Sequence, residues 1–227
     1  MQRRGRATST YRVSKKAFSH KAQYPRGLEG EGKVIKILNS RAHTTPLAKI
    51  NSNKGTFYIP AFNKMCEGQN IFFEKQEKIN HGDILSLKNI PVKTKVYCIE
   101  SKPNDGGKYI KTGGNSGVVS RIIGESVMVV MPSKKEKKFQ GNCRAIVGIV
   151  AGAQRLDKPV LKAGKKHHIK KSKSKLWPRT SAVKMNAIDH PFGSGRGKNP
   201  KPKIAKRNAP AGARVGLIRP RRTGKKK

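Results

Sequence analysis

His190 is the residue of this sequence best placed for proton chemistry. It follows Asp189, precedes Pro191 and Phe192, and stands just before a glycine-rich segment at 193–197. A histidine beside a carboxylate can be tuned to give or take a proton near neutral pH. The same pair can instead hold a rigid loop in a binding conformation through hydrogen bonds. We favour this second interpretation, because Asp189 is the only acid after residue 157.

The glycine-rich segment 193–197 reads Gly-Ser-Gly-Arg-Gly, which resembles a phosphate-binding loop. A dinucleotide site needs a strand before such a loop and a helix after it, and the sequence predicts neither here. We interpret the segment as backbone whose N–H groups can closely approach a phosphate or a sugar. His167 and His168 are adjacent with no acid within eight residues, which argues against a metal pair and favours stacking or hydrogen bonding to a bound partner.

Signatures of enzymes are absent from the sequence. It contains no Walker-type loop, no His-Glu-x-x-His and no Gly-x-Ser-x-Gly. Cys66, Cys98 and Cys143 are far apart and odd in number, which argues against a disulfide framework and a cysteine-rich zinc site. They fit a reducing compartment, and we predict three buried or half-buried side chains. We therefore expect no enzyme activity, no small-molecule substrate and no intrinsic cofactor.

The elements that must position these residues differ sharply in charge. The chain of 227 residues has 52 Lys and Arg against 12 Asp and Glu, a net charge of +40. Residues 1–28 hold eight basic residues and no acid, and residues 158–227 hold 23 basic residues and one acid. Such a chain repels itself unless a polyanion neutralises it, and nucleic acid is the commonest one. A membrane surface is the weaker candidate and we expect no membrane partner: the longest small or apolar run, 145–153, is far short of the ~20 residues of a spanning helix, and no basic stretch has the apolar face of an interfacial helix.

Between the basic ends, short apolar runs rich in β-branched and aromatic residues alternate with turn formers, which predicts strands. The runs lie at 34–38, 56–59, 71–73, 84–87, 96–99, 118–123, 127–131 and 145–150. Eight short strands are too many for one small sheet, so we expect two small antiparallel barrels in tandem. No long stretch has the apolar periodicity of a helix, so few helices are expected. Residues 158–227 are rich in proline and glycine and poor in apolar residues, which predicts an extended segment that orders on RNA.

Several motifs occur along the chain in the order found in one protein family. They are PLAK at 46–49, ESKPNDGG at 100–107, GGN at 113–115, CRAIVG at 143–148, DKP at 157–159, LKAGK at 161–165, WPR at 177–179, MN at 185–186, DHPFG at 189–193, APAG at 209–212, VGLI at 215–218 and RRTG at 221–224. In these motifs the sequence resembles uL2 (L2), a family of large-subunit ribosomal proteins. The form with Phe192 resembles the archaeal and eukaryotic cytosolic members, which points to a cytoplasmic ribosome.

The resemblance implies a mainly β fold, with an OB-type barrel followed by an SH3-like barrel and long basic N- and C-terminal extensions. We predict a basic N-terminal arm at 1–30, the OB-like barrel at 31–95, the SH3-like barrel at 96–172 and an RNA-threading tail at 173–227. The resemblance also implies that the protein lies near the subunit interface and the peptidyl-transferase region. Bacterial members have a second histidine where this chain has Phe192, so a proton-transfer role proposed for that histidine cannot operate here. The alternative that remains is assistance to peptide transfer by His190.

With this resemblance, the expected function is a structural constituent of the large ribosomal subunit that binds and organises rRNA and supports subunit association and tRNA placement. The expected partners are large-subunit rRNA, neighbouring ribosomal proteins, and tRNA and the small subunit at the interface. Mg2+ is expected only through the bound rRNA. We predict that rRNA is bound by basic, aromatic and glycine residues of the extensions, namely Arg3, Arg4, Arg6, Lys162, Lys165, His167, Arg179, His190, Phe192, Gly193, Arg196, Lys198, Arg207, Arg221 and Arg222.

Overall fold

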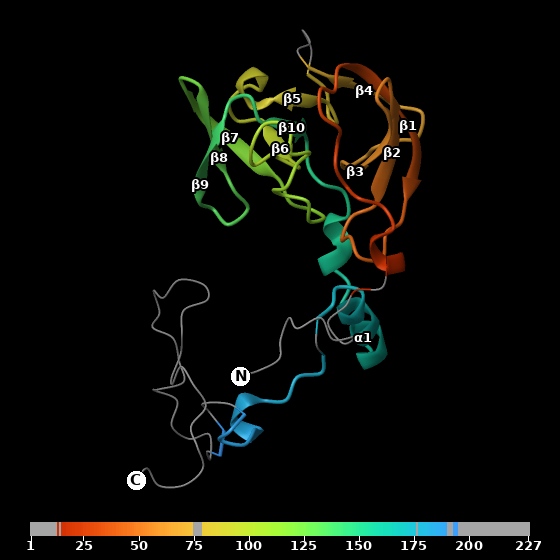
Figure 1. The fold of residues 1–227 in the computed structure, drawn as a ribbon, viewed down its shortest axis with the longest axis vertical. Coiled ribbons are helices and arrows are strands. Elements are labelled where there is room, and N and C mark those ends of the chain that lie inside the picture. Colours follow the sequence, from red (N-terminus) through yellow and green to blue (C-terminus); the bar gives the residue numbers. More distant parts are fainter. Residues whose placement is uncertain (1–12, 14, 75–78, 176, 190–192, 195–227) are drawn as a thin grey trace. The chain divides into compact units, whose positions relative to one another are not determined.

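The computed structural model describes residues 13, 15–74, 79–175, 177–189 and 193–194 (Figure 1). The chain separates into a strand unit, Ser14–Lys165, and a terminal unit formed by the residues before and after it. The described strands are β1 (Gly30–Leu38), β2 (Leu47–Ser52), β3 (Gly55–Pro60), β4 (Asn70–Phe73), β5 (Ile84–Ser86), β6 (Lys95–Tyr97), β7 (Gly117–Ile123), β8 (Ser126–Val130), β9 (Glu136–Gln140) and β10 (Arg144–Val147). The described helical segments are α1 (Ala163–Lys171) and 3-10 turns at Lys15–Phe18, Leu87–Asn89, Ala153–Leu156 and Ala182–Lys184. None of them is both long and apolar enough to cross a bilayer.

The described strands join into one sheet, in the order β3-β2-β1-β4-β5-β10-β6-β7-β8-β9. Neighbouring strands are antiparallel except β4 and β5, which meet in parallel at Phe73 and Ile84. In Figure 1, β1–β4 and β7–β9 lie on opposite sides of β5, β6 and β10. The prediction of a mainly β chain is confirmed. The described strands form one continuous sheet without a closed ring, although its two ends surround separate hydrophobic cores.

The three middle strands contribute to both cores, because successive side chains of a strand point to opposite faces. Ile84 packs in the core of the β1–β4 end and Leu85 in the core of the β7–β9 end. In β6, Tyr97 packs in the core of the β1–β4 end and Val96 in the core of the β7–β9 end. Strands buried on both faces read as continuous apolar runs, and this explains why these three were recognisable in the sequence.

Two strands and one helix were not predicted. β2 reads Leu-Ala-Lys-Ile-Asn-Ser, and its polar residues dilute the apolar signal. β9 reads Glu-Lys-Lys-Phe-Gln and buries only Phe139, because it pairs with β8 alone and forms one edge of the described sheet. α1 was missed because it lacks the apolar stripe by which helices are recognised.

The last part of the predicted N-terminal arm packs on the strand unit. Ala17, Ala22, Tyr24 and Leu28 are buried. The Tyr24 hydroxyl donates hydrogen bonds of 3.0 Å to the carbonyl oxygens of Cys98 and Arg144. Burial raises the pKa of Tyr24 well above its usual value, so the hydroxyl keeps the proton it donates. The division of the chain into an arm, two barrels and a tail stays a prediction.

A buried ion pair joins the segments around Tyr24. Glu100 is fully buried, and its carboxylate accepts a hydrogen bond of 2.9 Å from the Arg144 guanidinium. The backbone N–H groups of Arg144, Asn104 and Gly106 donate to the same carboxylate at 2.9, 3.2 and 3.0 Å. The Arg144 guanidinium also lies 4.9 Å from the centre of the Tyr24 ring. The charge of Glu100 is therefore matched by one cation and three backbone donors, which is what a buried carboxylate requires.

Candidate nucleic-acid interface

The most concentrated positive charge of the described residues lies on α1. The helix reads Ala-Gly-Lys-Lys-His-His-Ile-Lys-Lys and has no buried residue. Lys166 and Lys170 are four residues apart on one face, and like charges at this spacing destabilise a helix. Isolated helices shorter than about 12–15 residues are marginal in water. A polyanion along this face would remove the repulsion and stabilise the helix.

The chain turns back directly after α1. The N–H groups of Ser172 and Lys175 donate to the carbonyl oxygens of His168 and Lys170, both at 3.0 Å, which satisfies acceptors at the helix end. Trp177 is half-buried, and the Lys166 ammonium lies 5.9 Å from its ring centre, a cation–π distance. Arg179 is exposed two residues further on. Helix and turn thus present lysine, histidine and arginine side chains to solvent on a short stretch of chain.

Gly193 closes a loop that begins at Met185. A Cβ atom at residue 193 would lie 2.2 Å from the Asn186 carbonyl oxygen and 2.6 Å from that of Met185. Ser194 follows with a φ of +56°. Its N–H donates to the Met185 carbonyl at 2.9 Å, and its hydroxyl accepts from the Ala187 N–H at 3.1 Å. Ser194 therefore holds the two ends of the loop together.

The clash at Gly193 predicts that Gly193→Ala opens this loop. Overpacking of this kind costs about 1–3 kcal/mol, so hydrogen exchange at the Ser194 amide should accelerate by about tenfold or more. The matched control is Gly164→Ala in α1, where an added Cβ meets nothing within 4 Å. That variant should leave Ser194 unchanged and stabilise the helix by about 1 kcal/mol. Exchange rates at Ser194 that are equal in the two variants would contradict the packing seen at Gly193.

The structure describes five of the fifteen residues predicted to bind rRNA. Lys162, Lys165 and His167 lie in or next to α1, with Arg179 and Gly193 further along the chain. Lys162, Lys165, His167 and Arg179 are exposed, and Gly193 is half-buried. Lys166, Lys170 and Lys171 belong to the same helix and were not predicted; the signal is the run of lysines without an internal proline. The other ten lie outside the described residues: Arg3, Arg4, Arg6, His190, Phe192, Arg196, Lys198, Arg207, Arg221 and Arg222.

The described part of the chain holds no group of three or more His, Cys, Asp or Glu side chains arranged to bind a metal ion. Cys98 and Cys143 are buried as predicted, and burial raises the pKa of Cys98 to about 12, so its thiol keeps its proton. Cys66 is exposed, and the prediction that it is buried or half-buried is wrong. Cys66 follows Met65 in a segment between strands, where the sequence carries no burial pattern.

The sequence is similar to known proteins over nearly its whole length. Residues 80–212 match the family model for Ribosomal Proteins L2, C-terminal domain. The chain is 44% identical over 227 residues to "Large ribosomal subunit protein uL2" of Archaeoglobus fulgidus, with 98% of this chain and 96% of that protein covered. It is 40% identical to the proteins of the same name from Methanococcoides burtonii and Sulfurisphaera tokodaii, with 99% of this chain and 97% and 96% of those proteins covered.

Proposed function

This chain belongs to the uL2 family of large ribosomal subunit proteins, and from that premise we propose that it is a structural constituent of the large ribosomal subunit that binds and organises rRNA. Its partners are then rRNA and neighbouring ribosomal proteins, and its location is the cytoplasmic ribosome. The observation that carries the proposal is α1, a short helix of lysines and histidines with no buried side chain. Such a helix gains stability from a polyanion and not from a protein core.

Our proposal extends to the position of the protein within the subunit. We infer that it lies near the subunit interface and the peptidyl-transferase region, where it contacts tRNA and the small subunit. The support for this position is the resemblance of its motifs to those of uL2 proteins. Mg2+ belongs to the proposal only as an ion bound to the rRNA. The rRNA-binding roles of the fifteen residues are part of it as well, and the exposure of Lys162, Lys165, His167 and Arg179 favours those four.

A structural role requires no turnover by the protein itself. The names of its relatives describe a subunit protein, and they give no support to the alternative that His190 assists peptide transfer.

Competition between folded RNA and duplex DNA tests the proposal. RNA is recognised by shape, backbone and 2′-hydroxyl groups, so an unlabelled large-subunit rRNA fragment should displace a labelled one at least about tenfold better than duplex DNA of equal charge. This ratio corresponds to about 1.4 kcal/mol. Fluorescence anisotropy of the full chain at fixed salt provides the measurement. Equal displacement by both competitors would identify a general polyanion binder, such as an architectural DNA-binding protein, and would refute the proposed function.

A further inference from the structure

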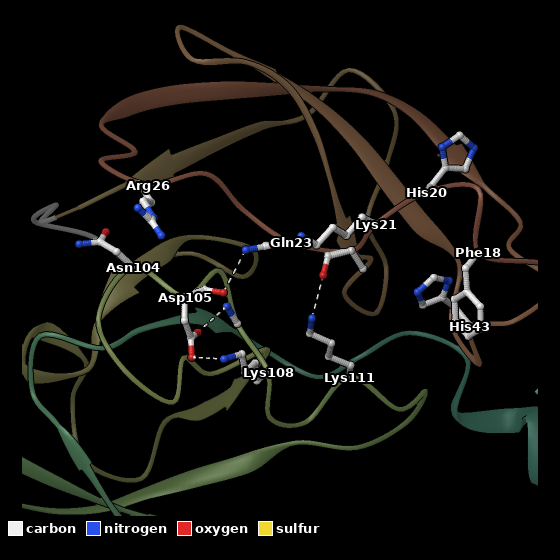
Figure 2. A pocket seen from close by; sticks show the side chains of 12 residues that line it. Phe18, His20, Lys21, Gln23, Arg26, His43, Asn104, Asp105, Lys108 and Lys111 are labelled. Atoms are coloured by element: carbon white, nitrogen blue, oxygen red, sulfur yellow. Dashed lines mark hydrogen bonds and ion pairs between the residues drawn. The ribbon is translucent and has the colours of Figure 1, made fainter. Parts of the chain in front are cut away.

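A pocket of about 590 Å³ lies within the strand unit (Figure 2). Its walls come from residues 18–26, from His43 and from residues 104–111, which are far apart in the sequence. Phe18, His20 and His43 lie toward one side of the view, and Arg26, Asn104 and Asp105 lie toward the other. Pockets for small ligands measure about 300–1,000 Å³, so this pocket has room for one nucleotide.

Hydrogen bonds hold the N-terminal wall of the pocket in place. The Gln23 N–H donates to the Tyr58 carbonyl of β3 at 2.9 Å, and the Gln23 side-chain amide donates to the Asp105 carbonyl at 3.1 Å. The Lys111 ammonium donates to the Ala22 carbonyl at 2.7 Å. These contacts join three distant segments, so the pocket is a built feature of the fold.

Two glycines, Gly106 and Gly107, allow the loop that forms the opposite wall to pack closely on its neighbours, Gln23 and Cys98. A Cβ atom at Gly106 would lie 2.1 Å from the Gln23 side chain, and one at Gly107 would lie 2.4 Å from the Cys98 carbonyl oxygen. Both glycines have positive φ, +79° and +83°, a conformation that other residues rarely adopt. The pair therefore both turns the loop and lets it contact the N-terminal wall.

The pocket carries an excess of positive charge. Asp105 is its one acid, and its carboxylate accepts hydrogen bonds from the N–H groups of Ser101, Lys102 and Gly107 and pairs with Lys108 at 3.3 Å. Burial raises the pKa of Asp105, but the hydrogen bonds from this loop outweigh it and leave the pKa below its usual value. The negative charge of Asp105 is thus already used within its own loop.

Apart from Lys108, the cationic side chains of the pocket form no ion pair with an acid in the described residues. Lys21 and Arg26 are exposed, and neither pairs with an acid in the part of the chain that the structure describes. Lys111 donates to a neutral carbonyl, and no ion pair of the described residues includes it. Burial, together with the charge of Lys111 and a smaller effect of His20, lowers the pKa of His43. An anion entering the pocket would meet Lys21, Arg26 and Lys111, none of which pairs with Asp105, the one carboxylate of the pocket.

The other side of the pocket offers aromatic surface. Phe18 is 49% exposed, which is unusual for a phenylalanine in a folded unit. The His43 ring packs against it nearly at a right angle, with the ring centres 5.2 Å apart, and about half of the Phe18 side chain stays accessible. The His20 ring packs on the Tyr58 ring, with the ring centres 4.4 Å apart, and this contact restrains its position. Unstacked RNA bases pack on rings of this kind.

We propose that this pocket binds a single unpaired nucleotide of an RNA, with its base on Phe18 and its phosphate between Lys21 and Lys111. This inference rests on the proposed RNA-binding function and adds a site in the strand unit, separate from the basic extensions. Stacking gives the site a preference for an unpaired base. A site that recognised only the shape and charge of RNA would bind a continuous duplex as tightly as an RNA with an unpaired base.

The test uses the full chain and two RNA hairpins that differ by one unpaired adenosine. The wild-type chain should bind the hairpin with the adenosine about tenfold more tightly, as expected for one stacked base. Phe18→Leu should abolish this preference. Phe72→Leu, the same change at a half-buried ring of β4 outside the pocket, should keep it. Lys21→Gln, at an exposed position that leaves the fold intact, should reduce the salt dependence of binding by about one phosphate contact.

The outcomes separate the pocket from the general function. A preference for the unpaired adenosine that survives Phe18→Leu, or a wild-type chain that binds both hairpins equally, would overturn the nucleotide pocket and leave the RNA-binding function standing. A wild-type chain that binds neither hairpin would overturn both. Loss of the preference in Phe18→Leu and its retention in Phe72→Leu would establish the site.

Discussion

Raising the salt concentration from about 50 mM to about 200 mM should weaken binding of the chain to rRNA by about a thousandfold to a hundred-thousandfold. The physical reason is the release of counterions from each phosphate that a lysine or arginine neutralises. A loss of this size corresponds to about 6–10 phosphate contacts. With 52 basic residues against 12 acidic ones, the chain can supply that many contacts from a fraction of its cations.

The contribution of α1 can be measured within the same titration. Replacing Lys165, Lys166, Lys170 and Lys171 by glutamine removes four charges from the helix and its exposed surface. If all four contact phosphates, the slope of log K against log salt should fall by about four, one for each contact. Arginine at the same four positions keeps the charge and should keep the slope.

Fluorescence anisotropy with a labelled rRNA fragment provides the slope, and a neutral osmolyte in place of salt controls for changes in water activity. A slope near zero in the wild-type chain would mean that binding does not depend on phosphates, against the expectation from its charge. A slope unchanged in the glutamine variant would place the phosphate contacts elsewhere on the chain.

The charge and the strands could be predicted from the sequence because both are local properties. Runs such as 84–85 and 96–99 are apolar at every position because their strands are buried on both faces. β9 could not be recognised, since only Phe139 faces a core and the lysines beside it are typical of an exposed edge strand. β2 was missed for another reason, because its polar residues interrupt the apolar run although Leu47, Ala48 and Ile50 are buried.

The pocket could not be predicted for a different reason. Phe18 and Lys21 belong to a stretch with the composition of a basic arm, and His43 and Lys111 belong to segments that carry no motif. What brings them together is the pairing of residues 22 and 23 with Tyr58 and the contact of Gln23 with the loop at Gly106. These contacts join residues that are between 35 and 83 positions apart in the chain, and neither composition nor periodicity reports on contacts of that range.

Glu100→Ala should destabilise the strand unit by about 3–5 kcal/mol, the usual cost of removing one partner of a buried ion pair. The Arg144 guanidinium would remain largely buried without its counter-charge, and the N–H groups of Asn104 and Gly106 would lose their acceptor. Folded proteins are stable by only about 5–15 kcal/mol, so the loss is a large share of the total. The midpoint of urea unfolding, followed by circular dichroism, provides the measurement.

Glu136→Ala is the matched control. Glu136 pairs with Arg121 at 3.2 Å, but the two side chains are 39% and 61% exposed. Exposed pairs of this kind contribute about 0–1 kcal/mol, so this variant should unfold close to the wild-type midpoint. Equal losses of stability in the two variants would show that burial does not determine how much the Glu100–Arg144 ion pair contributes to stability.

Glu100→Gln separates the charge of this group from its shape. Glutamine keeps one oxygen for the backbone donors, but its NH2 group would face the Arg144 guanidinium or a backbone N–H, because the carboxylate accepts from both with its two oxygens. We therefore expect the free energy of unfolding of Glu100→Gln to lie between those of the wild type and Glu100→Ala. Since Asn104 and Gly106 belong to the wall of the nucleotide pocket or adjoin it, the same variant should also weaken the preference for an unpaired adenosine while the chain is still folded. A Gln variant that unfolds like the Ala variant would mean that the negative charge, and not the geometry of the acceptor, holds these segments together.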